Sequence, residues 1–343
     1  MQRPTVNDIA RVAGVSLATV DRVLNARPGV RAKTIAAVND AIVRLGYVRD
    51  VAAANLARSR DYHFTVLLPN TKSQFVQTLA DALHGAAVMA AATRTRVNLV
   101  RFPAEDMHAL AQILATQAQQ GVAGVALMAP ETPVVRDAVR SLRAEGVPVV
   151  ALVSDLPNTD RDHYVGINSH KAGRTAGALM GRFVKSQEAR IMVVASSMLL
   201  RESIERRRGF DEIMQSDFAG FDVCQTLETH DSPRVLAQVV AELCTSVGPM
   251  DGIYLLGAGH RALTATLADL GLLGQMVVIG HELTPHSRDA LLAGHMDALI
   301  VQNVGHLARS ALRVLRAKAD GLAIDDSQET LRIEIITREN LPD

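Results

Sequence analysis

The outward face of one short predicted helix, over residues 16–25, carries side chains suited to contacts with DNA. The guanidinium of Arg22 can form two hydrogen bonds with guanine, and Leu17 and Ala18 suit contact with a thymine methyl group. Groups that can bond phosphates or base edges come from Ser16, Thr19 and Asn25. These residue types predict that the helix lies in a major groove.

Three predicted helices form the frame of this surface. Thr5-Val6-Asn7-Asp8 has the spacing of a helix start, at which the Thr5 hydroxyl accepts from a backbone amide, and the first helix runs to about Ala13. Gly14 permits the turn into the second helix, and a third helix spans about 32–45. Two short helices joined by a tight turn predict a helix-turn-helix, although the spacing alone also fits an ordinary helical hairpin.

The positive charge of the chain is concentrated in this head. Residues 1–60 hold ten basic and four acidic side chains, a net charge of +6, so the remaining residues carry −6 in a chain whose formal net charge is zero. A basic head on an acidic body is typical of a protein that binds a polyanion such as DNA. The charge therefore favours the helix-turn-helix over the hairpin.

The head resembles the lactose-repressor family of bacterial transcription regulators. The resemblance is carried by residues 5–10 (TVNDIA), 13–16 (AGVS), 19–25 (TVDRVLN), 33–34 (KT) and 45–47 (LGY). It implies that bases are read by Leu17, Ala18 and Arg22. It further implies that phosphates are held by Ser16, Thr19, Asn25 and Thr34, with Thr5 also at the DNA. Asp21 departs from the family, which commonly has serine at this position.

The resemblance continues into residues 49–60. Residues 51–57 (VAAANLA) are similar to the family's hinge helix, which folds on the operator. The likeness implies a DNA contact for Ala53 and a minor-groove wedge at Leu56. As bare sequence, this Ala-rich run is a good helix former that is too short to be stable alone. Arg49-Asp50 replaces the family's usual Pro-Asn or Pro-Ser, which predicts a looser entry to the hinge.

Length and composition set limits on the class of protein. With 343 residues, 48% of them hydrophobic, the chain is long enough for a head of residues 1–48, a linker of 49–60 and a body of 61–343. There is no apolar run of about 18 residues and no charged-then-apolar leader, which predicts a cytoplasmic protein without a membrane span. Cys224 and Cys244 are far from any C-x-x-C spacing, so we expect no disulfide framework, no metal and no cofactor.

Apolar strand-like runs alternate with helical patterns from His63 onward. Runs such as 122–128 and 147–153 are continuously apolar, which favours parallel sheets covered on both faces. The pattern restarts near Tyr164, so the sequence predicts two doubly wound parallel-sheet lobes with a cleft between them. We place lobe 1 at about 61–158 and 291–320, and lobe 2 at about 159–290 and 321–343.

The body resembles the type I periplasmic sugar-binding proteins, whose fold the lactose-repressor family shares as its effector domain. The resemblance implies that the cleft draws on Asn70, Phe75, Ser154, Asp155, Arg206, Gly257, His281, Glu282 and Gln302. Their chemistry suits a sugar or polyol, because the carboxylates accept from hydroxyls while Arg206 and Gln302 donate. Two plainer interpretations stay open: Arg206 as a surface arginine and His281-Glu282 as an ordinary loop pair.

An enzyme is the alternative. Residues 253–256 (IYLL), followed by Gly257-x-Gly259-x-x-Ala262 and by Glu282 at the next strand end, are similar to a dinucleotide fingerprint of an NAD-dependent oxidoreductase. Such a turn is common in parallel α/β proteins, and an enzyme would leave the head without a purpose. The sequence therefore predicts a non-enzymatic homodimer that binds double-stranded operator DNA under the control of a small-molecule effector, as a repressor by the family's commoner habit.

Overall fold

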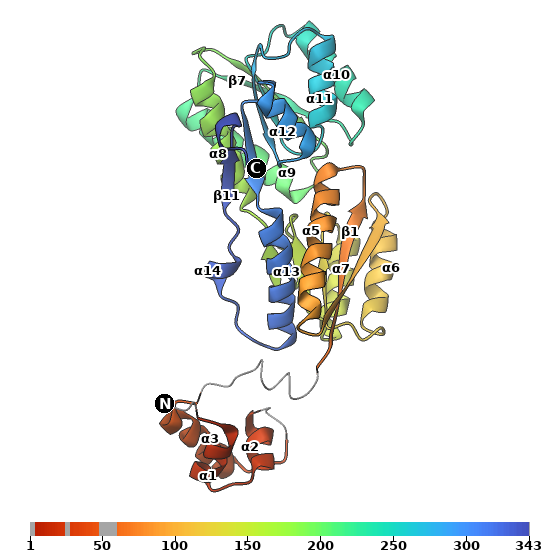
Figure 1. Ribbon diagram of the computed structural model, residues 1–343. Coiled ribbons are helices and arrows are strands. Elements are labelled where there is room, and N and C mark those ends of the chain that lie inside the picture. The colour runs from red at the N-terminus through yellow and green to blue at the C-terminus, as the bar shows by residue number, and fades with distance from the viewer. Residues whose placement is uncertain (1–3, 25–27, 48–59, 343) are drawn as a thin grey trace. The chain divides into compact units, whose positions relative to one another are not determined.

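The computed structural model describes residues 4–24, 28–47 and 60–342. Its contacts divide the chain after residue 60 into a small helical head and a larger body (Figure 1). The predicted DNA-contact residues Asn25, Ala53 and Leu56 lie outside the described residues, as does almost all of the predicted linker. The described part of the chain contains no helix that is both long and apolar enough to cross a membrane.

The head is built from three helices. They span Val6–Ala13 (α1), Leu17–Leu24 (α2) and Ala32–Leu45 (α3). α1 begins with the expected cap, in which the Asp8 amide donates to Thr5 Oγ1 at 3.4 Å and the Thr5 amide donates to Asp8 Oδ2 at 2.9 Å. Gly14 follows α1 at φ 65°, where a side chain would be strained. The predicted helix-turn-helix is confirmed.

The core of the head is small. Ile9, Val20 and Val38 are fully buried, one from each helix. Val12 of α1 and Ile35 of α3 are apolar, yet the two residues are 42% and 38% exposed. Other apolar residues of the same two helices, Ala13, Ile42 and Leu45, pack against the core instead.

The first sheet of the body, sheet A, has five parallel strands in the order β2-β1-β3-β4-β5. The strands are Tyr62–Asn70 (β1), Thr95–Pro103 (β2), Gly124–Leu127 (β3), Val149–Leu152 (β4) and His163–Val165 (β5). They are connected by Gln74–Ala91 (α5), Met107–Gln117 (α6) and Pro133–Ala144 (α7). Alternate residues of β1 enter different cores, Val66 with α5 and Leu67 with α6 and α7, so both faces are covered.

The second sheet, sheet B, has six strands in the order β11-β10-β9-β8-β6-β7, all parallel except β11. The strands are Arg190–Ala195 (β6), Asp222–Glu228 (β7), Gly252–Leu255 (β8), Val277–His281 (β9), Ala298–Gln302 (β10) and Ile333–Ile336 (β11). The helices around it are Ser169–Phe183 (α8), Arg201–Asp217 (α9), Pro233–Ser246 (α10), His260–Asp269 (α11) and Pro285–Leu292 (α12), with a final 3-10 turn at Arg338–Asn340.

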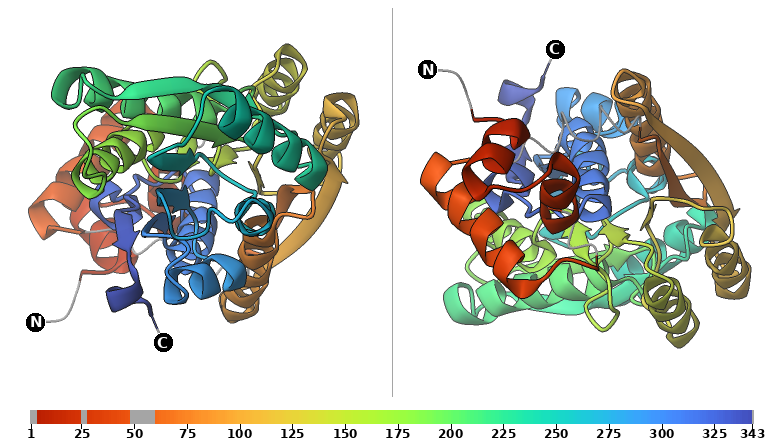
Figure 2. Two further views of the ribbon diagram at one scale, coloured as in Figure 1. Left: turned by 90° about the horizontal axis from the view of Figure 1, so that it is seen from above. Right: turned by 90° about the horizontal axis from the view of Figure 1, so that it is seen from below.

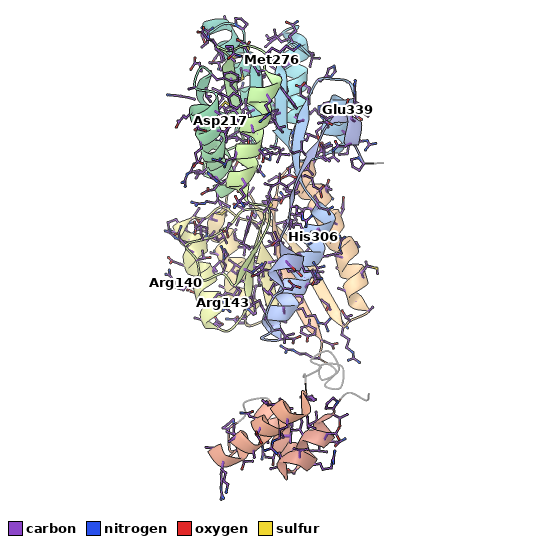
Figure 3. All side chains as sticks on the ribbon, turned by 90° about the vertical axis from the view of Figure 1, so that its left-hand side faces the viewer. Arg140, Arg143, Asp217, Met276, His306 and Glu339 are labelled. Atoms are coloured by element: carbon purple, nitrogen blue, oxygen red, sulfur yellow. The ribbon has the colours of Figure 1, made fainter. Side chains whose placement is uncertain are left out.

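The two sheets form two lobes, which we call lobe A and lobe B. In Figure 3, Arg140 and Arg143 of α7 mark lobe A, and Asp217 and Met276 mark lobe B. The chain passes between the lobes three times: from β5 to α8, from β10 to Val304–Ala319 (α13), and from α13 through Asp326–Glu329 (α14) to β11. Helix α13 packs beside α5 in lobe A (Figures 1 and 2). Because β5 and β10 both end at crossings, the carboxyl ends of both sheets lie where the lobes meet.

The lobe limits differ from those expected from the sequence. β5 was assigned to the second lobe, yet it pairs with β4 at the edge of sheet A. Residues 291–302 were assigned to the first lobe, yet β10 pairs with β9 in sheet B. An apolar run identifies a buried strand but not its hydrogen-bonding neighbour, so the pattern of runs could not place these two strands.

Two glycines bring α8 and α9 into backbone contact. A Cβ atom on Gly173 would lie 1.9 Å from the carbonyl oxygen of Arg206, and one on Gly209 would lie 2.0 Å from the carbonyl oxygen of His170. No side chain fits at such a distance, so only glycine lets the helices approach this closely. The contact fixes the position of the α9 backbone that carries Arg206.

Candidate functional site

The outward face of α2 presents the side chains that the sequence singled out. Leu17 is 50% exposed, and Ser16, Ala18 and Arg22 are exposed with it. Ser16 begins the helix: the Thr19 amide donates to Ser16 Oγ at 3.2 Å, and the two hydroxyl oxygens lie 2.9 Å apart. The face therefore offers one guanidinium, two hydroxyls and two small apolar groups to a partner.

A hollow of about 380 Å³ lies between α2 and the start of α3. Four predicted DNA contacts line it, namely Ser16, Thr19, Arg22 and Thr34. Arg31, the residue that precedes α3, also lines it and was not among the predicted contacts. Its position directly before a helix start, where anions are favoured, was the available signal. Hydroxyl and guanidinium groups around one hollow can hold a phosphate.

Thr5 has a structural role that the sequence also predicted. Its hydroxyl donates to Asp8 Oδ2 at 2.8 Å, so the exposed side chain is engaged within the head. Hydrogen bonds from the Thr5 backbone and side chain, with a further one from Arg11, lower the pKa of Asp8. The carboxylate form of the cap is thereby favoured.

In lobe B, three of the predicted effector residues form one buried polar cluster of Arg206, Glu282 and Gln302. Arg206 extends from α9, Glu282 follows β9, and Gln302 ends β10; these residues are 3%, 7% and 1% exposed. Gln302 Nε2 donates to Glu282 Oε1 at 2.8 Å, and Arg206 Nη2 lies 3.6 Å from the same oxygen. Arg206 Nη1 donates to the Leu256 carbonyl oxygen at 2.6 Å, at the end of β8. Arg206 is thus a buried residue of the cluster rather than a surface arginine.

The backbone is strained where the two sheets approach the junction. Glu282 has φ 71°, and Val153, directly before Ser154, has φ 63°. Both are in the left-handed region, which is costly for side chains and is concentrated at functional sites in proteins. The strain positions Glu282 at the carboxyl end of β9, so it is not an ordinary loop residue.

Burial dominates the electrostatics of the cluster. Loss of solvent raises the pKa of Glu282 to about 7, while the Arg206 charge and the Gln302 hydrogen bond act in the opposite direction. Burial likewise lowers the pKa of His281, whose side chain is fully buried and whose Nε2 lies 2.8 Å from the Tyr254 hydroxyl. His281 therefore packs against Tyr254.

Several buried polar atoms here have no hydrogen-bond partner. Among the described residues they include Glu282 Oε2, Gln302 Oε1, Arg206 Nε, Glu202 Oε2 and Ser154 Oγ. A buried polar atom left without a partner costs about 1–3 kcal/mol, so several such atoms at the meeting point of the lobes indicate a binding site. Four of the five can accept hydrogen bonds, and two belong to carboxyl groups.

The remaining predicted effector residues are arranged differently. Asp155 is bound by Arg161, whose Nη2 donates to Asp155 Oδ2 at 2.8 Å, so its carboxylate already has a cationic partner. Phe75 is half-buried against the large core of the body, Asn70 is exposed at the end of β1, and Gly257 is partly exposed after β8. No hydrogen bond joins these residues to the cluster among the described contacts.

A cavity of about 510 Å³, which we call the junction cavity, lies beside two of the crossings. Its wall includes residues 166–169 of the first crossing and residues 326 and 329–331 of the third, together with Asp155. From α9 it receives Glu202, which is 7% exposed and one turn before Arg206. Glu202 was missed by the sequence analysis, since a glutamate in the first turn of a helix is usual there. The described residues contain no group of three side chains that could hold a metal ion.

Comparison with known protein families gives two matches. Residues 5–50 match the bacterial regulatory proteins of the lacI family, and residues 64–323 match the periplasmic binding protein domain. The chain is 25% identical over 343 residues to the HTH-type transcriptional regulator GntR of Pseudomonas aeruginosa, covering 98% of this chain and 96% of that protein. It is 31% identical over 168 residues to the catabolite control protein A of Priestia megaterium, covering 49% of this chain and 48% of that protein, or about half of its length.

Solved structures resemble the body of the chain. The glucose-galactose binding protein GanP of Geobacillus stearothermophilus has a TM-score of 0.73 at 17% identity, covering 82% of this chain and 99% of that one. A solute binding protein of Burkholderia graminis in complex with D-arabinose has a TM-score of 0.74 at 20% identity, covering 82% and 96%. These similarities confirm the two-lobed fold.

Proposed function

Because the chain belongs to the periplasmic binding protein domain family and carries the head of the lacI family of bacterial regulatory proteins, we propose that it is a transcriptional repressor controlled by a small sugar or polyol. It is a DNA-binding regulator of the lacI family. We propose in addition that it acts as a repressor, that its effector is a sugar or polyol and that it forms a homodimer.

The observation that carries the effector proposal is the set of partnerless polar atoms around Arg206, Glu282 and Gln302. Hydrogen bonds hold Arg206 on α9 and both Glu282 and Gln302 at strand ends, where the two lobes meet. A ligand with several hydroxyl groups can satisfy donors and acceptors together, as carbohydrates do in polar pockets. GanP is a glucose-galactose binding protein and the other solved structure is a complex with D-arabinose, which supports the same class.

The DNA proposal depends on the exposed face of α2 and on the hollow beside it. Arg22, Leu17 and Ala18 are exposed on α2 and would contact base edges, while Ser16, Thr19 and Thr34 line the hollow and would contact phosphates. Two heads on a homodimer would read the halves of a pseudo-palindromic operator. The ligand acts through unequal affinity for the two states of the protein.

The test uses the full-length chain. A thermal-shift screen over neutral sugars and polyols comes first, because a bound ligand stabilises the folded state according to its occupancy. Binding to a labelled fragment of the gene's own promoter is then measured by fluorescence anisotropy, with and without the stabilising compound, against excess bulk DNA. We expect specific binding that the compound weakens. No preference for the promoter fragment would contradict the proposal, and tighter binding with the compound would contradict release by the effector.

The dehydrogenase alternative receives no support from the site. The Gly257-x-Gly259-x-x-Ala262 turn follows β8, far along the chain, whereas a dinucleotide fingerprint follows the first strand of its domain. The similar full-length protein GntR is a transcriptional regulator. We therefore propose no enzymatic function for the Gly257–Ala262 turn.

A further inference from the structure

The junction cavity has an acidic wall. Four acidic residues line it besides Glu202, namely Asp155, Glu205, Asp326 and Glu329. Only one arginine lines it, Arg201. The histidine of the β5 strand, His163, is half-buried, and burial lowers the pKa of its imidazole, which favours the neutral form.

Three of these carboxylates already have arginine partners. Arg313 binds Glu329 through two hydrogen bonds of 2.8 Å, and Arg201 Nη2 lies 2.5 Å from Glu205 Oε1. Arg161 binds Asp155 in the same paired manner. The charges of these pairs cancel locally, so they give the cavity shape and rigidity rather than an attraction for a charged ligand.

Glu202 differs from these three in having no such partner. The residue is only 7% exposed, and its Oε2 has no hydrogen-bond partner among the described residues. It lies one turn before Arg206 on α9, and its negative charge contributes to the raised pKa of Glu282. The one cation of the buried polar cluster, Arg206, is already engaged by Leu256 and Glu282. Burying a carboxylate without a cation is costly, so a bound ligand that supplies one is strongly favoured.

We propose that the effector carries a positively charged amino group, which Glu202 binds in the junction cavity. The inference rests on the proposed function in that the ligand is a sugar or polyol bound where the lobes meet. The expected class is therefore an amino sugar or an amino polyol. Its ammonium group would donate to Glu202, while its hydroxyl groups would contact other polar residues of the same wall, such as Asn168 and Thr330. A sugar acid is disfavoured, because its carboxylate would face Glu202.

The experiment measures binding of matched ligands to the full-length protein by isothermal titration calorimetry. The probes are D-glucosamine, D-galactosamine and D-mannosamine, each compared with its N-acetyl form and with the parent hexose. The N-acetyl form retains the ring and removes the charge. We expect one amino sugar to bind at least about tenfold more tightly than both neutral partners, since a charge-assisted hydrogen bond is about twice as strong as a neutral one.

Two variants separate the role of Glu202 from a general effect of negative charge on the helix. Glu202→Gln retains size and removes the charge, and it should abolish the preference for the amino sugar. Asp217→Asn is the matched control, because it removes one negative charge from the exposed far end of the same helix, outside the cavity. It should keep the preference.

The outcomes distinguish the two proposals. Equal or tighter binding of a neutral hexose in the wild type overturns the amino-sugar inference and leaves the proposed function in place. Binding of none of the probes overturns this inference, and if the wider sugar and polyol screen is also empty it overturns the proposed effector class. Retention of the preference in Glu202→Gln overturns the assignment of the charge contact to Glu202. The wild-type comparison decides the ligand class even if that variant does not fold.

Discussion

Replacing Glu282 by Gln should change how the stability of the protein depends on pH. Burial raises the pKa of Glu282 to about 7 in the folded chain, whereas a glutamate in the unfolded chain titrates near 4.5. The folded wild type therefore keeps a proton that the unfolded chain releases in this interval. Its free energy of unfolding falls as the pH rises from about 4.5 to 7 and then levels off.

The size of the effect follows from the difference between the two pKa values. A pKa difference from 4.5 to about 7 corresponds to about 3 kcal/mol at neutral pH. Glu282→Gln has no proton to lose, so the free energy of unfolding of the variant, minus that of the wild type, should rise by this order between pH 4.5 and 7. The buried histidines His260 and His281 titrate in both chains and cancel in the difference.

Urea unfolding followed by circular dichroism gives the free energies, since the chain has no tryptophan. The exposed Glu105→Gln provides the matched control and should follow the wild-type curve at every pH. A difference between Glu282→Gln and the wild type that stays constant from pH 4.5 to 7 would refute the reasoning, because Glu282 would then be ionised in both states throughout the interval.

Three further predictions concern the helices that position the two sites. Gly173→Ala should lower the free energy of unfolding of the body, measured in urea, by about 1–3 kcal/mol, because its Cβ would meet the Arg206 carbonyl oxygen. The control Gly85→Ala in α5, whose Cβ would have no atom within 4 Å, should not destabilise the body. Equal effects of the two substitutions would contradict the close contact at Gly173. Gly14→Ala should cost the head about 1–2 kcal/mol by calorimetry, since it forces a side chain into φ 65°, while Gly14→Asn should cost less. Arg22→Ala should lower the affinity for the promoter fragment by about 1–3 kcal/mol and narrow the gap to bulk DNA; the same loss on both would indicate a phosphate contact instead.

The head could be predicted closely because its signals are local. The cap at Thr5 and Asp8, the turn at Gly14 and the third helix over residues 32–45 all follow from neighbouring residues, and the structure has each of them. The exposure of Val12 and Ile35 depends instead on how many side chains three short helices can enclose. The number of enclosed side chains depends on how the three helices pack together, so the sequence of a single helix does not predict it.

In the body, the order of elements was predictable and their partners were not. The family resemblance indicated Arg206, Glu282 and Gln302, and the structure joins these three residues by direct contacts. Asp155 is acidic like Glu282 and also follows a strand, but Arg161 binds its carboxylate. Glu202 had no signal in the sequence, since its lack of a partner depends on how α9 meets residues from both crossings. Charge pairing across the fold decides which acids are available to a ligand.

Three covalent links between the lobes limit how they can move. A single connecting segment would let the two lobes rotate freely about it. Three connecting segments restrict the lobes to a hinge motion about those segments. A ligand bound in the junction cavity, which residues of the first and third crossings line, would set the angle between the lobes. Because β1 of lobe A begins at Tyr62, directly after the start of the body, a tilt of lobe A also turns the first residues of the body.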